Sequence, residues 1–203
     1  MLYTREIINK NIKFHDCVPQ VDNTVEINTY NYQDLSRLVD AYKNLFLKKG
    51  ATKGRTIVIG TQARLEQIAL VLACAELGMN IVIVGNPFPI VGHDTQVVKS
   101  VYTPGLISEQ YRSLLPVDFF VVKNQNCTDK FQAFKDTCRV TIVLDNEVLD
   151  FAPNDKILAT ESTPLIKCSG AGSKIVEHSH GFIAALSLRN STGFSGSMAM
   201  LTN

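Results

Sequence analysis

The stretch KCSGAGSKIVEHSHGF, residues 167–182, combines glycine, serine and lysine in the manner of an anion-binding loop. Glycines allow consecutive backbone N–H groups to converge on one oxygen, and a lysine adds positive charge. The residues that would contact a phosphate are Ser169, Gly170, Gly172, Ser173 and Lys174. The Walker pattern G-x-x-x-x-G-K-S/T is not satisfied, because too few residues separate the glycines from the lysine. The loop is therefore a candidate phosphate site, and a solvated lysine is the alternative interpretation of Lys174.

The histidines near acidic or histidine neighbours are the next candidates for chemistry. His178 and His180 could form an acid–base pair, but two positions apart at a helix entrance they should point in different directions. His93-Asp94 and His15-Asp16 are adjacent pairs with no third partner visible in the sequence. We interpret both pairs as surface hydrogen-bonding residues.

The cysteines indicate neither a zinc site nor a disulfide framework, because their number, five, is odd and no CxxC pair occurs. Cys168 lies next to a helix entrance, where a thiol pKa can be lowered. The alternative is a small residue that ends a buried strand. Ser169 lacks the G-x-S-x-G context of a nucleophile elbow. We expect reduced thiols in a cytoplasmic protein.

The segments that position the loop alternate between helices and strands. Apolar residues at helical spacing predict a helix over 32–46, with Asn31 and Asp34 at its front and Gly50 behind its end. The other expected helices are 62–77, 108–115, 128–137 and 180–190, and the expected strands are 55–60, 80–85, 117–122, 139–144 and one within 156–167. The order predicts an α/β fold with a mostly parallel sheet flanked by helices. Residues 86–104 are expected to form a loop region with at most a short helix.

Composition limits the classes of partner. The 203 residues are 45% hydrophobic and 19% charged, which is sufficient for a buried core. Lys and Arg number 20 against 19 Asp and Glu, so neither nucleic acid nor an anionic membrane is an expected partner. The N-terminus lacks the continuous apolar segment of a signal peptide, and no later run reaches spanning length.

Five segments carry a resemblance to a known family. YNYQDLSRLVDAYKNLFLKKGATKGRTIVIG is similar to a TYxEL helix followed by a G-x-x-x-G-D-x-V-x-I strand, and LVLACAELGMNIVIVGNPF to a helix ending A-x-x-x-L-G before xxVPLNP. The next two segments are ISEQYRSLLPVDFFVV and RVTIVLD, which are similar to an alternation of a helix, a strand, a helix and a strand with a closing aspartate. The last segment, SGAGSKIVEHSHGFIAAL, is similar to the loop S/T-S-G-S/T-T-G-x-P-K-G-V with its SH helix. In this order they resemble the N-terminal part of the adenylate-forming superfamily, which includes acyl-CoA synthetases, luciferases and nonribosomal peptide adenylation domains.

The resemblance, which runs from Tyr30 to Leu188, implies a domain division and a site. It implies an N-terminal arm over 1–29 and a truncated adenylate-forming-like α/β domain over 30–203. Ser169 and Gly170 match the family's Ser-Gly, Lys174 matches its loop lysine, and Ser179-His180 match the start of its helix. In the family this loop surrounds the β- and γ-phosphates of ATP while a carboxylate is adenylated.

Two departures from the family pattern decide the functional hypothesis. The loop is about two residues short, with Ala171 replacing hydroxyl residues and Ser173 and Ile175 replacing proline and glycine, and two residues span up to ~7 Å. The chain also stops before the family's adenine motif, ribose-binding aspartate and catalytic lysine. We therefore expect a non-catalytic protein that acts as a binding or structural component through a protein partner or homo-oligomer covering an exposed apolar sheet.

Two alternatives from other functional classes remain open. The alternative to the leading hypothesis is the N-terminal half of a split ATP-dependent acyl- or aminoacyl-adenylating ligase, with ATP and Mg²⁺ as cofactors. The chain is also interpretable as a free-standing sensor of nucleotides or acyl groups. The leading hypothesis requires no cofactor and no metal.

Overall fold

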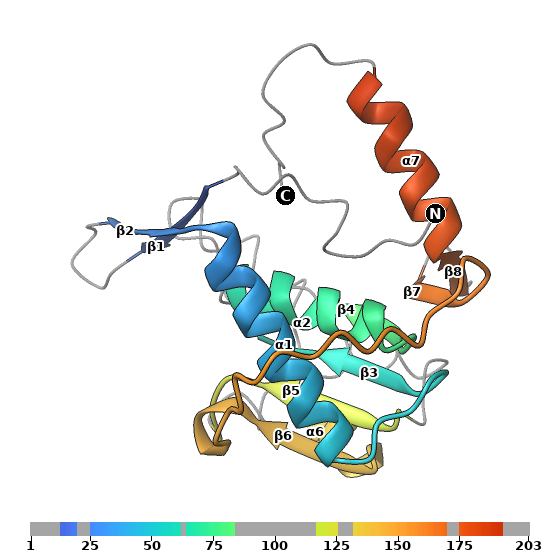
Figure 1. The fold of residues 1–203 in the computed structure, drawn as a ribbon. Coiled ribbons are helices and arrows are strands. Elements are labelled where there is room, and N and C mark those ends of the chain that lie inside the picture. The colour runs from blue at the N-terminus through green and yellow to red at the C-terminus, as the bar shows by residue number, and fades with distance from the viewer. Residues whose placement is uncertain are drawn as a thin grey trace, which may run out of the picture.

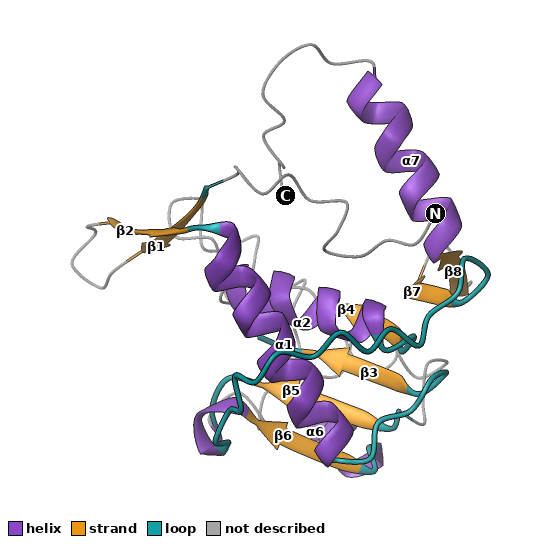
Figure 2. Cartoon of the chain, in the orientation of Figure 1, coloured by secondary structure: helices purple, strands orange, loops and turns teal. Residues whose placement is uncertain are grey.

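The computed structural model describes residues 13–19, 25–61, 64–83, 117–125, 132–169 and 175–192. These residues form an α/β structure with one small antiparallel sheet and one larger, mostly parallel sheet (Figures 1 and 2). The strands are β1 (Phe14–Pro19), β2 (Val25–Tyr30), β3 (Thr56–Ile59), β4 (Asn80–Ile83), β5 (Phe119–Val122), β6 (Val140–Val143), β7 (Pro164–Ser169) and β8 (Ile175–Ser179). The helices are α1 (Tyr32–Lys48), α2 (Arg64–Glu76), α6 (Gln132–Thr137) and α7 (His180–Thr192), and a 3₁₀ turn, η4, covers Leu144–Asn146. The predicted fold class is confirmed.

The larger sheet has the strand order β6-β5-β3-β4-β7-β8. Its first five strands are parallel, and β8 is antiparallel to β7. All four residues of β5 are buried, as are Ile57, Val58 and Ile59 of β3. Successive strand residues point to opposite faces, so burial of neighbouring residues means that both faces are covered. The parallel arrangement follows the sequence prediction, whereas the expected exposed apolar face is not found on these strands.

Helix α1 begins where the sequence predicts. Asn31 Oδ1 accepts a hydrogen bond from the Asp34 backbone N–H, and Asp34 Oδ2 accepts one from the Asn31 backbone N–H, each 3.0 Å long. This reciprocal capping box satisfies two N–H groups that the helix itself cannot pair. Beyond the helix, Gly50 has φ 83°, a left-handed conformation that favours glycine.

Two segments contain strands that the sequence did not predict. Strands β1 and β2 pair as an antiparallel hairpin within and just beyond the segment expected to be an arm. Strand β8 lies between the glycine loop and α7, and α7 begins at His180, where the sequence predicted a helix. The Ile-Val run of β8 pairs with β7 instead of joining the helix. The predicted loop at 86–104 and the predicted helix at 108–115 lie outside the described residues.

A long irregular segment connects η4 to β7. From Glu147 to Thr163 it contains neither helix nor strand, and it crosses the outer side of α1 before it reaches the end of α2 (Figure 2). We call residues 147–158 the strap. Its Leu149 and Leu158 are partly buried against the hydrophobic core. Among the described helices, none has both the length and the apolar character needed to cross a bilayer.

Candidate functional site

The glycine loop connects two antiparallel strands. Ser169, the last residue of β7, is the Cα partner of Ile175, the first residue of β8. Such partners lie about 5 Å apart, so both ends of the loop are fixed close together. Of the predicted phosphate-binding residues, Ser169 lies at a described strand end, whereas Gly170, Gly172, Ser173 and Lys174 lie outside the described residues. Five residues, 170–174, therefore make the whole connection.

The base of this hairpin is attached to the turn that precedes β7. The backbone N–H of His180 donates to Thr163 O at 3.1 Å, and that of Gly181 donates to Glu161 O at 3.0 Å. A Cβ atom at Gly181 would lie 3.3 Å from the same Glu161 oxygen, so a larger residue would crowd this contact. The start of α7 and the turn over 160–163 thus determine together where the hairpin begins.

The two histidines beside the loop have different surroundings. The His178 ring stacks on Phe182, with 4.8 Å between the ring centroids and 12° between the planes. His180 is the first residue of α7 and is fully buried. The two imidazole rings therefore lie in different environments, one stacked on a partly exposed aromatic ring and one inside the protein.

A polar cluster lies at the carboxyl edge of the parallel strands. Thr61 follows β3, Lys123 follows β5, and Asp145 follows β6, and parallel strands bring such ends to the same edge of a sheet. Lys123 Nζ contacts Glu66 Oε1 and lies 3.4 Å from Asp145 Oδ1, while the Thr61 hydroxyl donates to Glu66 Oε2 at 3.4 Å. We call Thr61, Glu66, Lys123 and Asp145 the carboxyl-edge cluster. It ties α2 to three strands.

The charges of this cluster stabilise one another. Partial burial by itself lowers the pKa of Lys123, but the hydrogen bond and charge of Glu66, followed by those of Asp145, outweigh it and raise the pKa. The lysine is consequently positive at neutral pH and is shared between two carboxylates. Among the described residues, no group of three His, Cys, Asp or Glu side chains is arranged to hold a metal ion.

The cluster occupies a position in the topology where α/β sheets often bind ligands. From β3 the chain continues to β4 on one side, whereas from β5 it continues to β6 on the other. Ligands of open α/β sheets bind at the carboxyl ends of strands at such a switch point. Sequence reasoning missed Glu66 and Lys123. The available signal was that Lys123 and Asp145 each directly follow an apolar strand run.

Comparison with solved structures identifies the architecture. A fatty acyl-adenylate ligase from L. pneumophila superposes with a TM-score of 0.62 and 16% identity, covering 85% of this chain and 29% of that one. An adenylation domain of a keto acid-selecting NRPS module gives a TM-score of 0.60 and 16% identity, covering 83% and 30%. The Mycobacterium tuberculosis fatty acyl CoA synthetase gives a TM-score of 0.56 and 13% identity, and the match covers 76% of this chain and 30% of that one. The fold is that of the adenylate-forming enzymes.

The match to the adenylate-forming fold confirms the resemblance that the sequence motifs predicted. This chain spans about 30% of the length of these three structures, as expected for the N-terminal part of that architecture. No protein-family model matches the chain, and no curated protein matches it in sequence.

Proposed function

We propose that this protein uses an adenylate-forming fold without the adenylation chemistry, as a binding or structural component that acts through protein–protein contacts. The observation that carries the proposal is the β7–β8 register. Because Ser169 is opposite Ile175, only residues 170–174 are available to surround a phosphate. The family's pattern has about two more residues at this place, and two residues span up to ~7 Å of chain.

The composition of the loop supports the same proposal. Ala171 provides no hydroxyl where the family has Ser or Thr, and a strand residue, Ile175, replaces the glycine that follows the family's lysine. Loss of two hydrogen bonds to charged oxygens, at roughly 1.5–3 kcal/mol each, lowers ATP affinity by about two to four powers of ten. Neither ATP nor Mg²⁺ is needed for the proposed role.

Exposed apolar side chains support a protein as the partner. Six large apolar residues of the described segments are more than a third exposed, and they lie on β2, the strap and α7: Ile27, Val148, Phe151, Ile157, Phe182 and Leu186. The formal net charge of +1 is too small to attract nucleic acid or an anionic membrane electrostatically. We therefore propose a second copy or another polypeptide as the partner, in the cytoplasm.

ATP–pyrophosphate exchange tests the proposal. The purified chain is incubated with ATP, Mg²⁺ and a panel of fatty, aromatic and amino acids, and a full-length acyl-CoA synthetase serves as positive control. We expect exchange at the no-enzyme background. Titration calorimetry with ATP, AMP and an acyl-AMP analogue should give no heat at micromolar ligand. Acid-dependent exchange by the chain alone would refute the proposal, and saturable nucleotide heat without exchange would favour a sensor.

The second candidate function is the N-terminal half of a split ATP-dependent acyl- or aminoacyl-adenylating ligase. It is favoured by the position of Ser169 at the carboxyl end of β7, a strand parallel to β4 in the same sheet that holds the carboxyl-edge cluster. In this case Ser169, Gly170, Gly172, Ser173 and Lys174 would contact the phosphates. The test is exchange after co-purification with a polypeptide carrying the family's ribose-binding aspartate; activity restored by that chain and lost in Lys174→Ala would establish it.

A further inference from the structure

The strap presents apolar side chains to solvent although other strap residues already pack inward. Val148 is 91% exposed, Phe151 47% and Ile157 39%. Their neighbours Leu149 and Leu158 turn toward the core. Packing of the strap therefore does not require apolar residues at the outward positions, and exposed apolar side chains gathered on one segment indicate an interaction surface.

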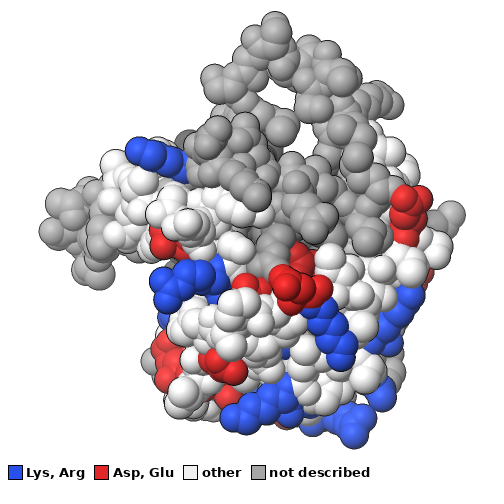
Figure 3. All heavy atoms as spheres, viewed as in Figure 1, with Lys and Arg blue, Asp and Glu red and all other residues white. Residues whose placement is uncertain are grey.

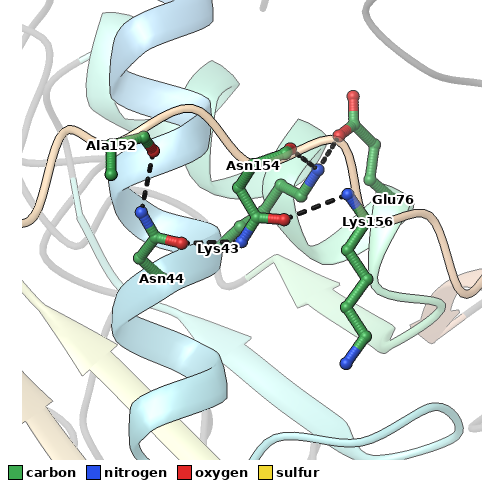
Figure 4. Close-up of polar contacts among 6 residues, drawn as sticks. All are labelled: Lys43, Asn44, Glu76, Ala152, Asn154 and Lys156. Atoms are coloured by element: carbon green, nitrogen blue, oxygen red, sulfur yellow. Dashed lines mark hydrogen bonds and ion pairs between the residues drawn. The ribbon is translucent and has the colours of Figure 1, made fainter.

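Polar contacts on the inner side hold the strap in one conformation (Figure 4). Lys43 Nζ donates to the carbonyl oxygen of Asn154 at 2.6 Å and also lies 2.6 Å from Glu76 Oε2. Asn44 Nδ2 donates to the carbonyls of Asp150 at 3.0 Å and Ala152 at 2.9 Å. These contacts come from adjacent residues of α1. An irregular segment fixed in this way loses little further conformational freedom when a partner binds.

The exposed aromatic ring is also held in place. The guanidinium carbon of Arg37 lies 5.8 Å from the centroid of the Phe151 ring, within the range of a cation–π contact. Phe151 is consequently an exposed aromatic side chain whose ring is held by a contact with Arg37 of α1. Aromatic and arginine side chains of this kind are enriched among the residues that dominate binding energy in protein interfaces.

The charges on this face match a second copy of the same chain. Around the exposed apolar residues lie two exposed carboxylates, Asp150 and Asp155, and two exposed cations, Arg37 and Lys156. Figure 3, viewed as in Figure 1, shows charged groups of both signs on this face among uncharged atoms. A two-fold axis brings the same patch of both subunits together, so a patch with equal numbers of both signs can pair each charge with its opposite. The net charge of +1 adds little repulsion between copies.

We propose that Val148, Phe151 and Ile157 form a preorganised surface through which two copies of this chain associate, and that Lys43 and Asn44 position the strap for it. The inference rests on the proposed function, because it specifies one of its protein–protein contacts. It assigns the contact to the strap instead of a sheet face.

Sedimentation velocity from low micromolar to sub-millimolar concentration tests the assignment. We expect wild-type protein to shift from monomer to dimer, and Val148→Asp and Phe151→Asp each to weaken dimerisation by about tenfold or more, since both side chains are exposed and their replacement leaves the core intact. Asn44→Ala should weaken dimerisation less, because it loosens the strap without changing the surface. Ile27→Asp, an equally drastic change at a 63% exposed residue of β2, should leave the dimer unchanged.

Other outcomes overturn the inference. Wild-type protein that stays monomeric at every concentration rules out the second copy as occupant, and a dimer that resists both strap substitutions but is lost in Phe182→Asp moves the interface to α7. Pyrophosphate exchange, measured on the same preparations, separates the two proposals. Exchange contradicts the proposed function whatever the association state, whereas a monomer without exchange contradicts only the strap dimer.

Discussion

Lys43 of α1 and Glu76 of α2 form an ion pair 2.6 Å long in which the two side chains are 0% and 1% exposed. The pair lies beneath the strap, and the same ammonium group donates to Asn154 O. A buried ion pair adds little net stability, because desolvation of both charges offsets their attraction. Removal of one partner is costly, however, since the other charge is left buried alone.

Lys43→Met should therefore destabilise the protein by about 3–5 kcal/mol, measured by urea denaturation. The double variant Lys43→Met/Glu76→Met should recover part of that loss, because no isolated carboxylate remains. Lys48→Met, an exposed lysine of the same helix, is the matched control and should change stability by about 0.5 kcal/mol or less. Equal effects at the two lysines would contradict the structure.

Gly78→Ala and Gly50→Ala form a matched pair, since both glycines have positive φ, 67° and 83°. An alanine at either position incurs the left-handed penalty of about 1–2 kcal/mol. At Gly50 the new Cβ meets nothing within 4 Å, whereas at Gly78 it would lie 3.3 Å from Ala159 Cα and 3.2 Å from Lys53 Cγ. We expect Gly78→Ala to be the more destabilising in thermal unfolding. The reverse order would show that Ala159 and Lys53 do not lie against Gly78.

Asn31→Ala should lower the free energy of unfolding by about 1 kcal/mol, because it removes the side chain that caps α1. Asn31→Asp preserves the acceptor oxygen and should restore most of that stability. Denaturant midpoints of the three proteins provide the measurement. If alanine and aspartate behaved alike, the cap would not contribute as the hydrogen bonds indicate.

Stability should fall in alkali because of Tyr42. Burial, and then the charge of Glu66, raise the pKa of its phenol. The folded state favours the neutral phenol, so this contribution is complete below the unfolded pKa of about 10 and is lost as pH rises above it, at up to about 1.4 kcal/mol per pH unit. Urea denaturation between pH about 9 and about 11 should show a shallower decline for Tyr42→Phe than for wild type. Parallel declines would disprove the assignment.

A double-mutant cycle between Glu66→Gln and Lys123→Met, measured by urea denaturation, should give a coupling free energy of about 0.5–1 kcal/mol. Added salt should reduce this coupling, because the lysine is partly exposed. Lys123 lies farther from Asp145, so the corresponding cycle with Asp145→Asn should give a smaller coupling. A coupling that is absent in both cycles would mean that the carboxyl-edge cluster does not hold α2 to the sheet.

The features that the sequence predicted are those encoded by neighbouring residues. The start of α1 follows from Asn31 and Asp34, three positions apart, and its end follows from Gly50. Apolar runs revealed β3 and β5 because strands covered on both faces consist of continuous apolar residues. Ser169 was expected in the loop after a strand within 156–167, whereas it is the last residue of β7.

The features that the sequence did not predict depend on residues that are far apart in the chain. Lys123 meets Glu66 across 57 positions, and Lys43 meets Asn154 across 111, so no local pattern reveals either contact. Helical periodicity alone does not show that Lys43 is buried, because its burial depends on Glu76 and on a segment without secondary structure. Strand β8 was not predicted because the Ile-Val run follows directly on a glycine- and lysine-containing loop pattern and was interpreted as part of that loop.

The β7–β8 pair makes this protein a suitable recipient for loop exchange. Since Ser169 and Ile175 face each other in the ladder, a transplanted segment would replace residues 170–174 between these two partners. The natural test is a chimera that carries a seven-residue nucleotide loop from a working ligase, roughly the family's length, because loop length helps to set the register of a hairpin. If such a chimera binds ATP while the parent protein does not, the rest of the fold can still accommodate a nucleotide, and the short loop alone prevents binding.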